Sequence, residues 1–425
     1  MQHKIAVIGL GYVGLPLAVE FSKHYPVVGY DIQTQKIERL LKGVDYTKEL
    51  AHGDLHSLLS TDQKEQGFFP TSNPEDLKDC RIYIITVPTP ITSDNKPDLE
   101  PLFNASTLVA AFLKKGDLVI YESTVYPGCT EEDCVPILEQ VSGLTYNKDF
   151  FCGYSPERVN PGDLENRLPN IMKVTSGSTH DVALRVDNLY KTIITAGTYL
   201  APSIKVAEAS KAIENAQRDV NISFMNELSL MFDKMNIDTH DVLAAAGTKW
   251  NFLPFKPGLV GGHCIGVDPY YLAHKAKTLG YHPAVLLSGR KVNDQMGSFV
   301  AHKMVKLLLK KGVPVTKSKI LILGFTFKEN CPDIRNTKVI DVYTELVDYN
   351  IDVDVYDPWA NKEEVSLTYG INLLPDFNVE EYQGVVLAVS HKEFLSIDFA
   401  AFKKLNAVIF DTKAFINRTL VDARL

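Results

Sequence analysis

The sequence has no excess of basic residues, and this absence excludes one large class of partners. Its 425 residues include 44 Lys and Arg against 52 Asp and Glu, a formal net charge of −8. Domains that bind nucleic acid carry a basic patch or stripe, so we expect no nucleic-acid partner. An anionic ligand must then be held by a few well-placed cations rather than by the field of the whole protein.

Long apolar runs and a cysteine framework are also missing. No run approaches the roughly 20 apolar residues that a membrane-spanning helix needs. Residues 4–9 already form a predicted strand, which leaves no room for a signal peptide. Six cysteines spread over the chain are typical of reduced thiols. Cys129 and Cys134 have no matching His or Cys pair nearby, so no metal is expected. We therefore predict a cytoplasmic protein without membrane association.

What the chain does contain is an alternation of strands and helices. Short apolar runs occupy 4–9, 27–31, 82–87, 118–122 and 150–154, with helical spacers between them. This alternation predicts an α/β fold with a doubly wound parallel sheet over about the first 200 residues.

From residue 204 to about 235 the pattern is one long helix. Its apolar residues recur at helical spacing and are Ala207, Ile213, Ala216, Val220, Phe224, Leu228 and Phe232. A stretch of this length without glycine or proline exceeds an ordinary helix. We predict a spine that joins two domains and offers a surface for a homodimer or a higher homo-oligomer.

A second α/β pattern begins at 319–324 and continues through three further strand-like runs at 353–357, 384–389 and 407–411. Its turn GFTF at 324–327 lacks the glycine spacing of a dinucleotide site, so we expect another ligand there. The predicted architecture is two Rossmann-like domains joined by the long helix and a helical middle domain. The predicted boundaries are 1–202, 203–309 and 310–425.

The first predicted strand leads into a glycine-rich turn, GLGYVG at residues 9–14. The spacing G-x-G-x-x-G permits a tight turn, close approach of a pyrophosphate and packing of the helix on the strand. The N–H groups at the start of the helix then attract the anion. Asp31 ends the second strand, where a carboxylate accepts from the ribose hydroxyls and repels a 2′-phosphate. The combination predicts NAD as the cofactor, with Lys36 near the same ribose.

Thr86, Pro88 and Thr124 follow the next two predicted strands. Ligands of open parallel sheets bind at the carboxyl ends of the strands, so these residues are candidates for the same site. Ordinary turn formation is the alternative explanation for them.

One cysteine has surroundings that suit chemistry. Cys264 lies in GGHCIGVD at residues 261–268, among glycines that leave room for a substrate and four residues before Asp268. Interconverting an alcohol and a carbonyl needs no thiol, but a thiol can capture an aldehyde for a second oxidation. The turn therefore indicates oxidation of an alcohol through to an acid. A buried structural thiol is the alternative.

Two further groups have both a functional and a structural interpretation. Lys211 and Asn215 share a face of the long helix; they either belong to a solvated polar stripe or stabilise a developing oxyanion. Glu157 follows a predicted strand, and it either activates a water that releases an acyl-enzyme or pairs with Arg158.

Together these motifs resemble the UDP-sugar 6-dehydrogenases, NAD-dependent four-electron oxidoreductases of the UDP-glucose/GDP-mannose dehydrogenase family. The resemblance runs over nearly the whole chain. It includes GLGYVG at 9–14, TVPTP at 86–90, ESTV at 122–125, SPE at 155–157, Lys211 with Asn215, GGHC at 261–264 with Asp268, and Phe327-Lys328 with Arg335.

The resemblance implies a reaction. The C6 alcohol of a UDP-sugar becomes an aldehyde, Cys264 captures it as a thiohemiacetal, a second oxidation gives a thioester, and water releases the uronate. In this scheme Lys211 and Asn215 hold the oxyanion and Asp268 assists proton transfer.

The resemblance also implies the remaining roles. Thr124 and Glu157 would arrange the water, and the C-terminal domain would hold UDP, with Lys413 where relatives often carry arginine. The NAD contacts are then expected from Gly9, Gly11, Tyr12, Val13, Gly14, Asp31, Lys36, Thr86, Pro88, Thr124 and Arg335. The substrate contacts are expected from Glu157, Arg158, Val159, Lys211, Asn215, Phe255, Gly258, Gly261, Lys328 and Lys413.

Two departures bear on the sugar. UDP-glucose dehydrogenases commonly carry a second glutamate four residues after the one matched by Glu157, where this chain has Pro161. The run after Cys264, IGVDPYY, also resembles the branch that oxidises UDP-GlcNAc or UDP-GalNAc for capsule or O-antigen synthesis. A UDP-glucose 6-dehydrogenase is the main alternative. A one-step hydroxyacid dehydrogenase and a catalytically silent nucleotide-binding module are the others.

Overall fold

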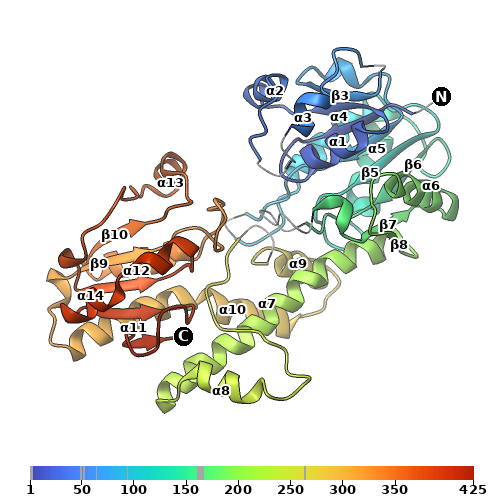
Figure 1. The fold of residues 1–425 in the computed structure, drawn as a ribbon. Helices are drawn as coiled ribbons and strands as arrows, with labels where there is room; N and C mark the ends of the chain where they lie inside the picture. Colours follow the sequence, from blue (N-terminus) through green and yellow to red (C-terminus); the bar gives the residue numbers. More distant parts are fainter. Residues whose placement is uncertain are drawn as a thin grey trace. The chain divides into compact units, whose positions relative to one another are not determined.

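The chain forms two compact units in the computed structural model. The structure describes residues 3–47, 50, 53–63, 65–92, 94–159, 167–262 and 265–425. One unit comprises the chain up to residue 214 with 270–280, and the other comprises 215–269 with 281–425. The boundary falls inside α7 (Ile204–Met235), one uninterrupted helix with the bounds that the sequence predicts (Figure 1). The division into three domains at residues 202 and 309 stays a prediction.

The N-terminal unit is built on an eight-stranded sheet in the order β3-β2-β1-β4-β5-β6-β7-β8. The strands are β1 (Ile5–Ile8), β2 (Pro26–Tyr30), β3 (Gly67–Thr71), β4 (Ile82–Ile85), β5 (Asp117–Tyr121), β6 (Phe150–Tyr154), β7 (Lys173–Gly177) and β8 (Thr198–Leu200). The first six follow the strand order of dinucleotide-binding sheets. Only the pairing of β6 with β7 is antiparallel among these strands.

Burial on both faces explains the apolar strands of this sheet. All four residues of β1 are buried, with Ile5 opposite Val27 on one side and Ile82 on the other. Helices on the two faces supply that cover, as parallel strands require. The helices of this unit are α1 (Gly14–Ser22), α2 (Thr34–Leu41), α3 (Asp54–Leu58), α4 (Glu100–Ala110), α5 (Val135–Ser142) and α6 (His180–Lys191), with most of α9 (Asp268–Thr278).

The C-terminal unit has a parallel sheet in the order β10-β9-β11-β12-β13. Its strands are β9 (Lys319–Leu323), β10 (Asp352–Tyr356), β11 (Gly384–Leu387), β12 (Val408–Asp411) and β13 (Ala423–Arg424). Its helices are α8 (Thr239–Ala246), α10 (Ala284–Asp294), α11 (Met296–Lys310), α12 (Val339–Asp348), α13 (Lys362–Tyr369) and α14 (Phe399–Lys404). Along β9, Ile320 and Ile322 pack in one apolar core, while Leu321 and Leu323 pack in another on the opposite face. The prediction of two doubly wound α/β domains is confirmed.

The residues of the predicted apolar stripe of α7 differ in burial. Ala207 and Ala216 are buried, whereas Ile213 and Phe224 are 56% and 54% exposed. The helix instead presents an exposed apolar face made of Val206, Ile213, Phe224, Met231 and Met235. Steps of seven, eleven, seven and four residues keep these side chains on one side of a 3.6-residue helix. Within the described ranges no helix is long and apolar enough to cross a membrane.

A buried ion pair joins α7 to α10 in the C-terminal unit. Arg290 donates to Asp219 over 2.5 Å, and Asn293 donates to the same carboxylate over 2.8 Å. Arg290 also pairs with Asp294 at 2.5 Å. Burial raises the pKa of Asp219, and the charge of Arg290 opposes that shift. The carboxylate therefore depends on its cation.

We predict that Arg290→Met lowers the free energy of unfolding by about 3–5 kcal/mol, because it leaves a buried charge without its counterion. The double variant Asp219→Leu/Arg290→Met recovers most of that loss. Urea denaturation measures both. Lys291→Met, at an exposed position of the same helix, is the control. A loss below about 1 kcal/mol, the range of a surface pair, would contradict the assignment.

Candidate functional site

The turn after β1 has the geometry of a dinucleotide site. Gly9 has φ +93°, in the left-handed region. A Cβ at Gly14 would lie 1.8 Å from the Gly9 carbonyl oxygen, so helix α1 can start there only with glycine. A Cβ at Gly11 would meet nothing within 4 Å, which leaves open space beside the turn for a ligand.

Asp31, directly after β2, is buried and organises this turn. Its Oδ2 accepts from the N–H of Leu10 at 3.0 Å and lies 3.5 Å from Nζ of Lys36, while Oδ1 accepts from the N–H of Gln33 at 2.9 Å. The predicted neighbours Asp31 and Lys36 are thus brought together. Two N–H groups and a cation fix the carboxylate, and a ribose hydroxyl can still donate to its remaining lone pairs.

A cavity of about 590 Å³ opens beside Asp31. Its lining is largely apolar and includes Gly9, Asp31, Ile32, Lys36, Val87, Pro88, Pro101, Asn104 and Leu108. An apolar cavity of this size with a few placed polar groups suits a nucleoside. The residues present therefore fit NAD.

The loops after β4 and β5 are tied to each other and to the glycine turn. The hydroxyl of Thr86 donates to the carbonyls of Gly9 and Ile8 at 2.7 and 3.0 Å. The hydroxyl of Thr89 donates to the carbonyl of Thr124 at 2.7 Å. Thr86 therefore shapes the turn with its side chain, whereas the half-buried side chain of Thr124 makes no hydrogen bond with the described residues.

Glu157 lies beside the glycine-rich turn of the same unit. It lines a small hollow of about 20 Å³ with Tyr12, Val13, Val159 and Arg167, among others. Its Oε1 accepts from the backbone N–H groups of Arg158 and Val159, both at 2.6 Å. The predicted alternative of a pair with Arg158 is not what forms, because the Arg158 guanidinium pairs with Glu214 at 2.8 Å.

The predicted oxyanion residues on α7 are buried. Asn215 donates from Nδ2 to Oδ2 of Asp268 over 2.6 Å, and both side chains are buried. Lys211 is only 8% exposed and forms no ion pair or hydrogen bond with the residues that the structure describes. The solvated polar stripe is therefore wrong for these two residues, because both side chains are buried.

Cys264 and His263 lie outside the described residues, but the glycines before them are described. A Cβ at Gly261 would lie 2.4 Å from the Asn336 carbonyl, and one at Gly262 would lie 2.7 Å from the Phe327 ring. The N–H of Gly262 also donates to Asn336 at 3.2 Å. These two positions must be glycine because another segment of the same chain packs closely against them. The sequence pattern alone does not reveal this reason.

Two predicted substrate residues meet in the C-terminal unit. A Cβ at Gly258 would lie 3.9 Å from Nζ of Lys413. Asn226 fixes Gly258 with two hydrogen bonds, one to its carbonyl at 3.0 Å and one from its N–H at 2.8 Å. Burial lowers the pKa of Lys413. Phe255, also predicted, is half-buried in the same loop.

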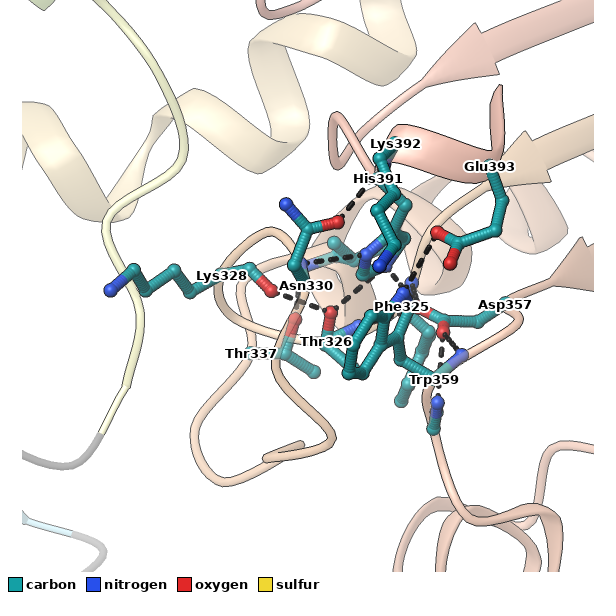
Figure 2. Close-up of polar contacts among 12 residues, drawn as sticks. Phe325, Thr326, Lys328, Asn330, Thr337, Asp357, Trp359, His391, Lys392 and Glu393 are labelled. Atoms are coloured by element: carbon teal, nitrogen blue, oxygen red, sulfur yellow. Dashed lines mark hydrogen bonds and ion pairs between the residues drawn. The ribbon is translucent and has the colours of Figure 1, made fainter. Parts of the chain in front are cut away.

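The turn GFTF after β9 is filled from within the protein. Asp357, after β10, accepts from the N–H groups of Phe325 and Thr326 at 2.6 and 3.1 Å, and from Nε2 of His391 at 3.0 Å. His391 accepts at Nδ1 from the N–H of Asn330, so its proton lies on Nε2. Figure 2 shows this cluster, with the side chain of Lys328 pointing away from it.

This cluster occupies the carboxylate that a dinucleotide ribose would need at the second turn. Asp357 also accepts from the N–H groups of Trp359 and Ala360 at 2.7 and 2.8 Å. Burial alone would raise the pKa of Asp357, but the bonds from His391 and the backbone outweigh it and lower the pKa. The carboxylate is saturated, so no lone pair is left for a ribose. Arg335, a predicted NAD contact, pairs with Asp333 at 2.5 Å.

The N-terminal unit also contains a buried ionic group that no sequence motif marks. Lys173, the first residue of β7, lies 2.6 Å from Oε2 of Glu122 and 3.4 Å from Oε2 of Glu157. A lysine at a strand end is usually exposed, so no sequence signal marks Lys173. Glu122 lies in the predicted ESTV motif, but the motif gives it no role.

The glycine turn, the acidic residue after β2 and the strand order define an NAD-binding α/β protein. Sequence profiles of the UDP-glucose/GDP-mannose dehydrogenase family agree with this class. The NAD binding domain of the family matches residues 3–194, its central domain matches 205–295, and its UDP binding domain matches 321–418. The chain belongs to the UDP-glucose/GDP-mannose dehydrogenase family and is an NAD-dependent dehydrogenase.

Individual relatives match over the full length. The chain is 55% identical to a UDP-N-acetyl-D-glucosamine 6-dehydrogenase of Pseudomonas aeruginosa, with 99% of each chain covered. It is 54% identical to an enzyme of the same name from Salmonella typhi, with 100% of this chain and 99% of the other covered. Among solved structures, a UDP-D-ManNAc dehydrogenase from Pyrococcus horikoshii has a TM-score of 0.88 at 30% identity, with 99% and 98% covered.

We predict that Asp31→Asn weakens NAD binding about tenfold, because it replaces charge-assisted hydrogen bonds to the ribose with weaker ones. Isothermal titration with NAD measures the dissociation constant. Glu38→Gln, at an exposed position of α2, is the matched control and leaves the affinity unchanged. An unchanged affinity in Asp31→Asn would place the ribose elsewhere.

Proposed function

We propose that the chain oxidises the C6 alcohol of UDP-N-acetyl-D-glucosamine to the carboxylate. Two full-length relatives above 50% identity carry the name of that activity, and Pro161 fits the same branch. The observation that carries the chemistry is the Asn215–Asp268 hydrogen bond of 2.6 Å, with the buried Lys211 one helical turn away from Asn215 along α7. UDP-GalNAc is a second candidate sugar, and UDP-glucose is the main alternative.

Each residue has a role that its chemistry suits. NAD, when bound, supplies the hydride acceptor, and two equivalents are needed per uronate. The ammonium of Lys211 stabilises the alkoxide and the later oxyanion. Asn215 orients Asp268, which takes up a proton. The Cys264 thiolate adds to the aldehyde carbon to give a thiohemiacetal, and loss of the second hydride leaves a thioester.

Hydrolysis of the thioester completes the reaction. The oxygen of a water adds to the acyl carbon, its proton passes to Glu157, and the carbon–sulfur bond breaks with the electron pair leaving on Cys264. The half-buried Thr124 assists in holding this water. We assign UDP contacts to the C-terminal unit, where Lys413 and Gly258 meet, and to Lys328. A nucleotide-activated uronate of this kind would serve capsule or O-antigen synthesis.

We predict two NADH per uronate from UDP-N-acetylglucosamine. Absorbance at 340 nm counts NADH, and mass spectrometry of the nucleotide sugar counts uronate in parallel assays with UDP-GlcNAc, UDP-GalNAc and UDP-glucose. Equal or faster turnover of UDP-glucose would overturn the sugar assignment. One NADH per turnover with no acid would overturn the four-electron reaction.

We also propose a homodimer formed through the exposed apolar face of α7. This face carries Val206, Ile213, Phe224, Met231 and Met235 in one line. A row of large apolar side chains in water is unfavourable by about 25 cal/mol for each Å² that could be buried. A second copy of the same helix can bury it with two-fold symmetry.

We predict that the double variant Ile213→Asp/Phe224→Asp shifts the protein from dimer to monomer. Light scattering after size-exclusion chromatography gives the mass. Lys234→Glu, exposed on another side of α7, leaves the mass unchanged. A wild-type chain that is monomeric at micromolar concentration, or an Asp variant that stays dimeric, would reject this surface.

A further inference from the structure

We propose that Lys173 is a positioning residue for Glu157: it fixes the Glu157 carboxylate beside the nucleotide turn and supplies the positive charge that faces it. The proposal rests on the proposed function, in which Glu157 takes a proton from the hydrolytic water. Lys173 itself touches neither substrate nor water, because its side chain is only 2% exposed.

The geometry leaves the Glu157 carboxylate one orientation. Its Oε1 is held by the N–H groups of Arg158 and Val159, both at 2.6 Å, while Oε2 lies 3.4 Å from Nζ of Lys173. The side chain keeps 13% exposure, at the hollow that it lines with Tyr12. Three donors thus orient a carboxylate that still reaches open space.

The charges around Lys173 are not balanced. Glu122, fully buried, lies 2.6 Å from Nζ of Lys173 and also accepts from the hydroxyl of Tyr190. Glu157 is the second carboxylate on the same ammonium, so one cation serves two anions. Among the described residues, no other cation lies within salt-bridge distance of the pair. Arg158 pairs with Glu214 on α7, and Arg167, which lines the same hollow as Glu157, forms no ion pair with either carboxylate.

The directions of the pKa shifts agree with this arrangement. Burial lowers the pKa of Lys173, but the charges of Glu122 and Glu157 outweigh it and raise the pKa. Burial raises the pKa of Glu122, with Lys173 opposing and Glu157 reinforcing the shift. Without Lys173, the buried Glu122 would lose its ion-pair partner among the described residues, and Oε2 of Glu157 would lose its donor.

Three variants test the proposal, and the measurement is kcat as a function of pH. The proposal predicts that two of the variants shift the acid limb of this profile in opposite directions. In Lys173→Met, a proton remains on the carboxylate pair, so kcat falls on the order of a hundredfold and its acid limb moves to higher pH. In Glu122→Gln, the whole charge of Lys173 acts on Glu157, so the acid limb moves to lower pH. Lys173→Arg keeps the cation and the wild-type limb. In Lys173→Met the KM for the UDP-sugar falls together with kcat, so kcat/KM stays unchanged, because hydrolysis follows the capture of the sugar.

A second readout separates positioning from a purely structural role. Acid-quenched Lys173→Met, mixed with UDP-N-acetylglucosamine and NAD, should carry a uronyl thioester on the peptide that contains Cys264, because hydrolysis is the slowed step. The wild-type enzyme should carry much less. If Lys173→Met does not fold, Glu122→Gln and Lys173→Arg still decide the question.

The outcomes distinguish failure of the proposed function from failure of the role of Lys173. A wild-type enzyme that forms no uronate with two NADH refutes the proposed function. A wild-type enzyme that does so, with Lys173→Met showing the same kcat and the same limb, refutes only the role of Lys173. A Glu122→Gln limb that stays in place or moves to higher pH also refutes it.

Discussion

Both sheets depend on buried carboxylates at the carboxyl ends of their parallel strands. Asp31 follows β2, Glu122 follows β5, Asp357 follows β10, and Asp411 ends β12. Each of these side chains is buried, and each must find partners because an unpaired buried charge is very costly. The partners of the three aspartates are chiefly backbone N–H groups of the adjoining loops, as where Asp411 accepts from Lys413 and Ile416 at 2.8 and 2.7 Å, whereas Glu122 accepts from Lys173 and Tyr190. The loops that form the candidate sites are shaped in this way.

A buried aspartate after a strand has different consequences in the two units, because Asp31 and Asp357 differ in the number of their partners. Asp31 binds two N–H groups and the ammonium of Lys36, and a cavity of about 590 Å³ opens beside it. Asp357 binds four N–H groups and a buried histidine, so it has no capacity left. The turn after β1 therefore has a carboxylate and a cavity that suit a nucleotide. In the turn after β9 the carboxylate is already fully bonded, so we expect a different ligand in the C-terminal unit.

Much of this was predictable from sequence because it is local. Apolar runs gave the strands to within about two residues, and the glycine spacing with Asp31 located the nucleotide turn. The strands β3, β7, β8 and β13 were not predicted. In β7 the buried Lys173 breaks the apolar pattern, and β13 has only two residues. Of the predicted apolar stripe on α7, only Ile213 and Phe224 lie on the exposed face, because helical spacing alone does not say which apolar residues are covered.

The site was predictable only as separate motifs. The sequence placed Lys211 with Asn215 because they lie on one helix, but the bond from Asn215 to Asp268 spans 53 residues. The link from Lys173 to Glu122 spans 51 residues and carries no motif. Long-range pairs of this kind depend on the tertiary arrangement of helices and strands, which local patterns do not contain.

The account depends most on Cys264 as the group that carries the acyl intermediate. The direct measurement is product mass after incubation of Cys264→Ala with UDP-N-acetylglucosamine and excess NAD, beside the wild-type enzyme. The account predicts uronate from the wild-type enzyme and none from the variant, with NAD affinity unchanged. Uronate formed by the variant at the wild-type rate would contradict it.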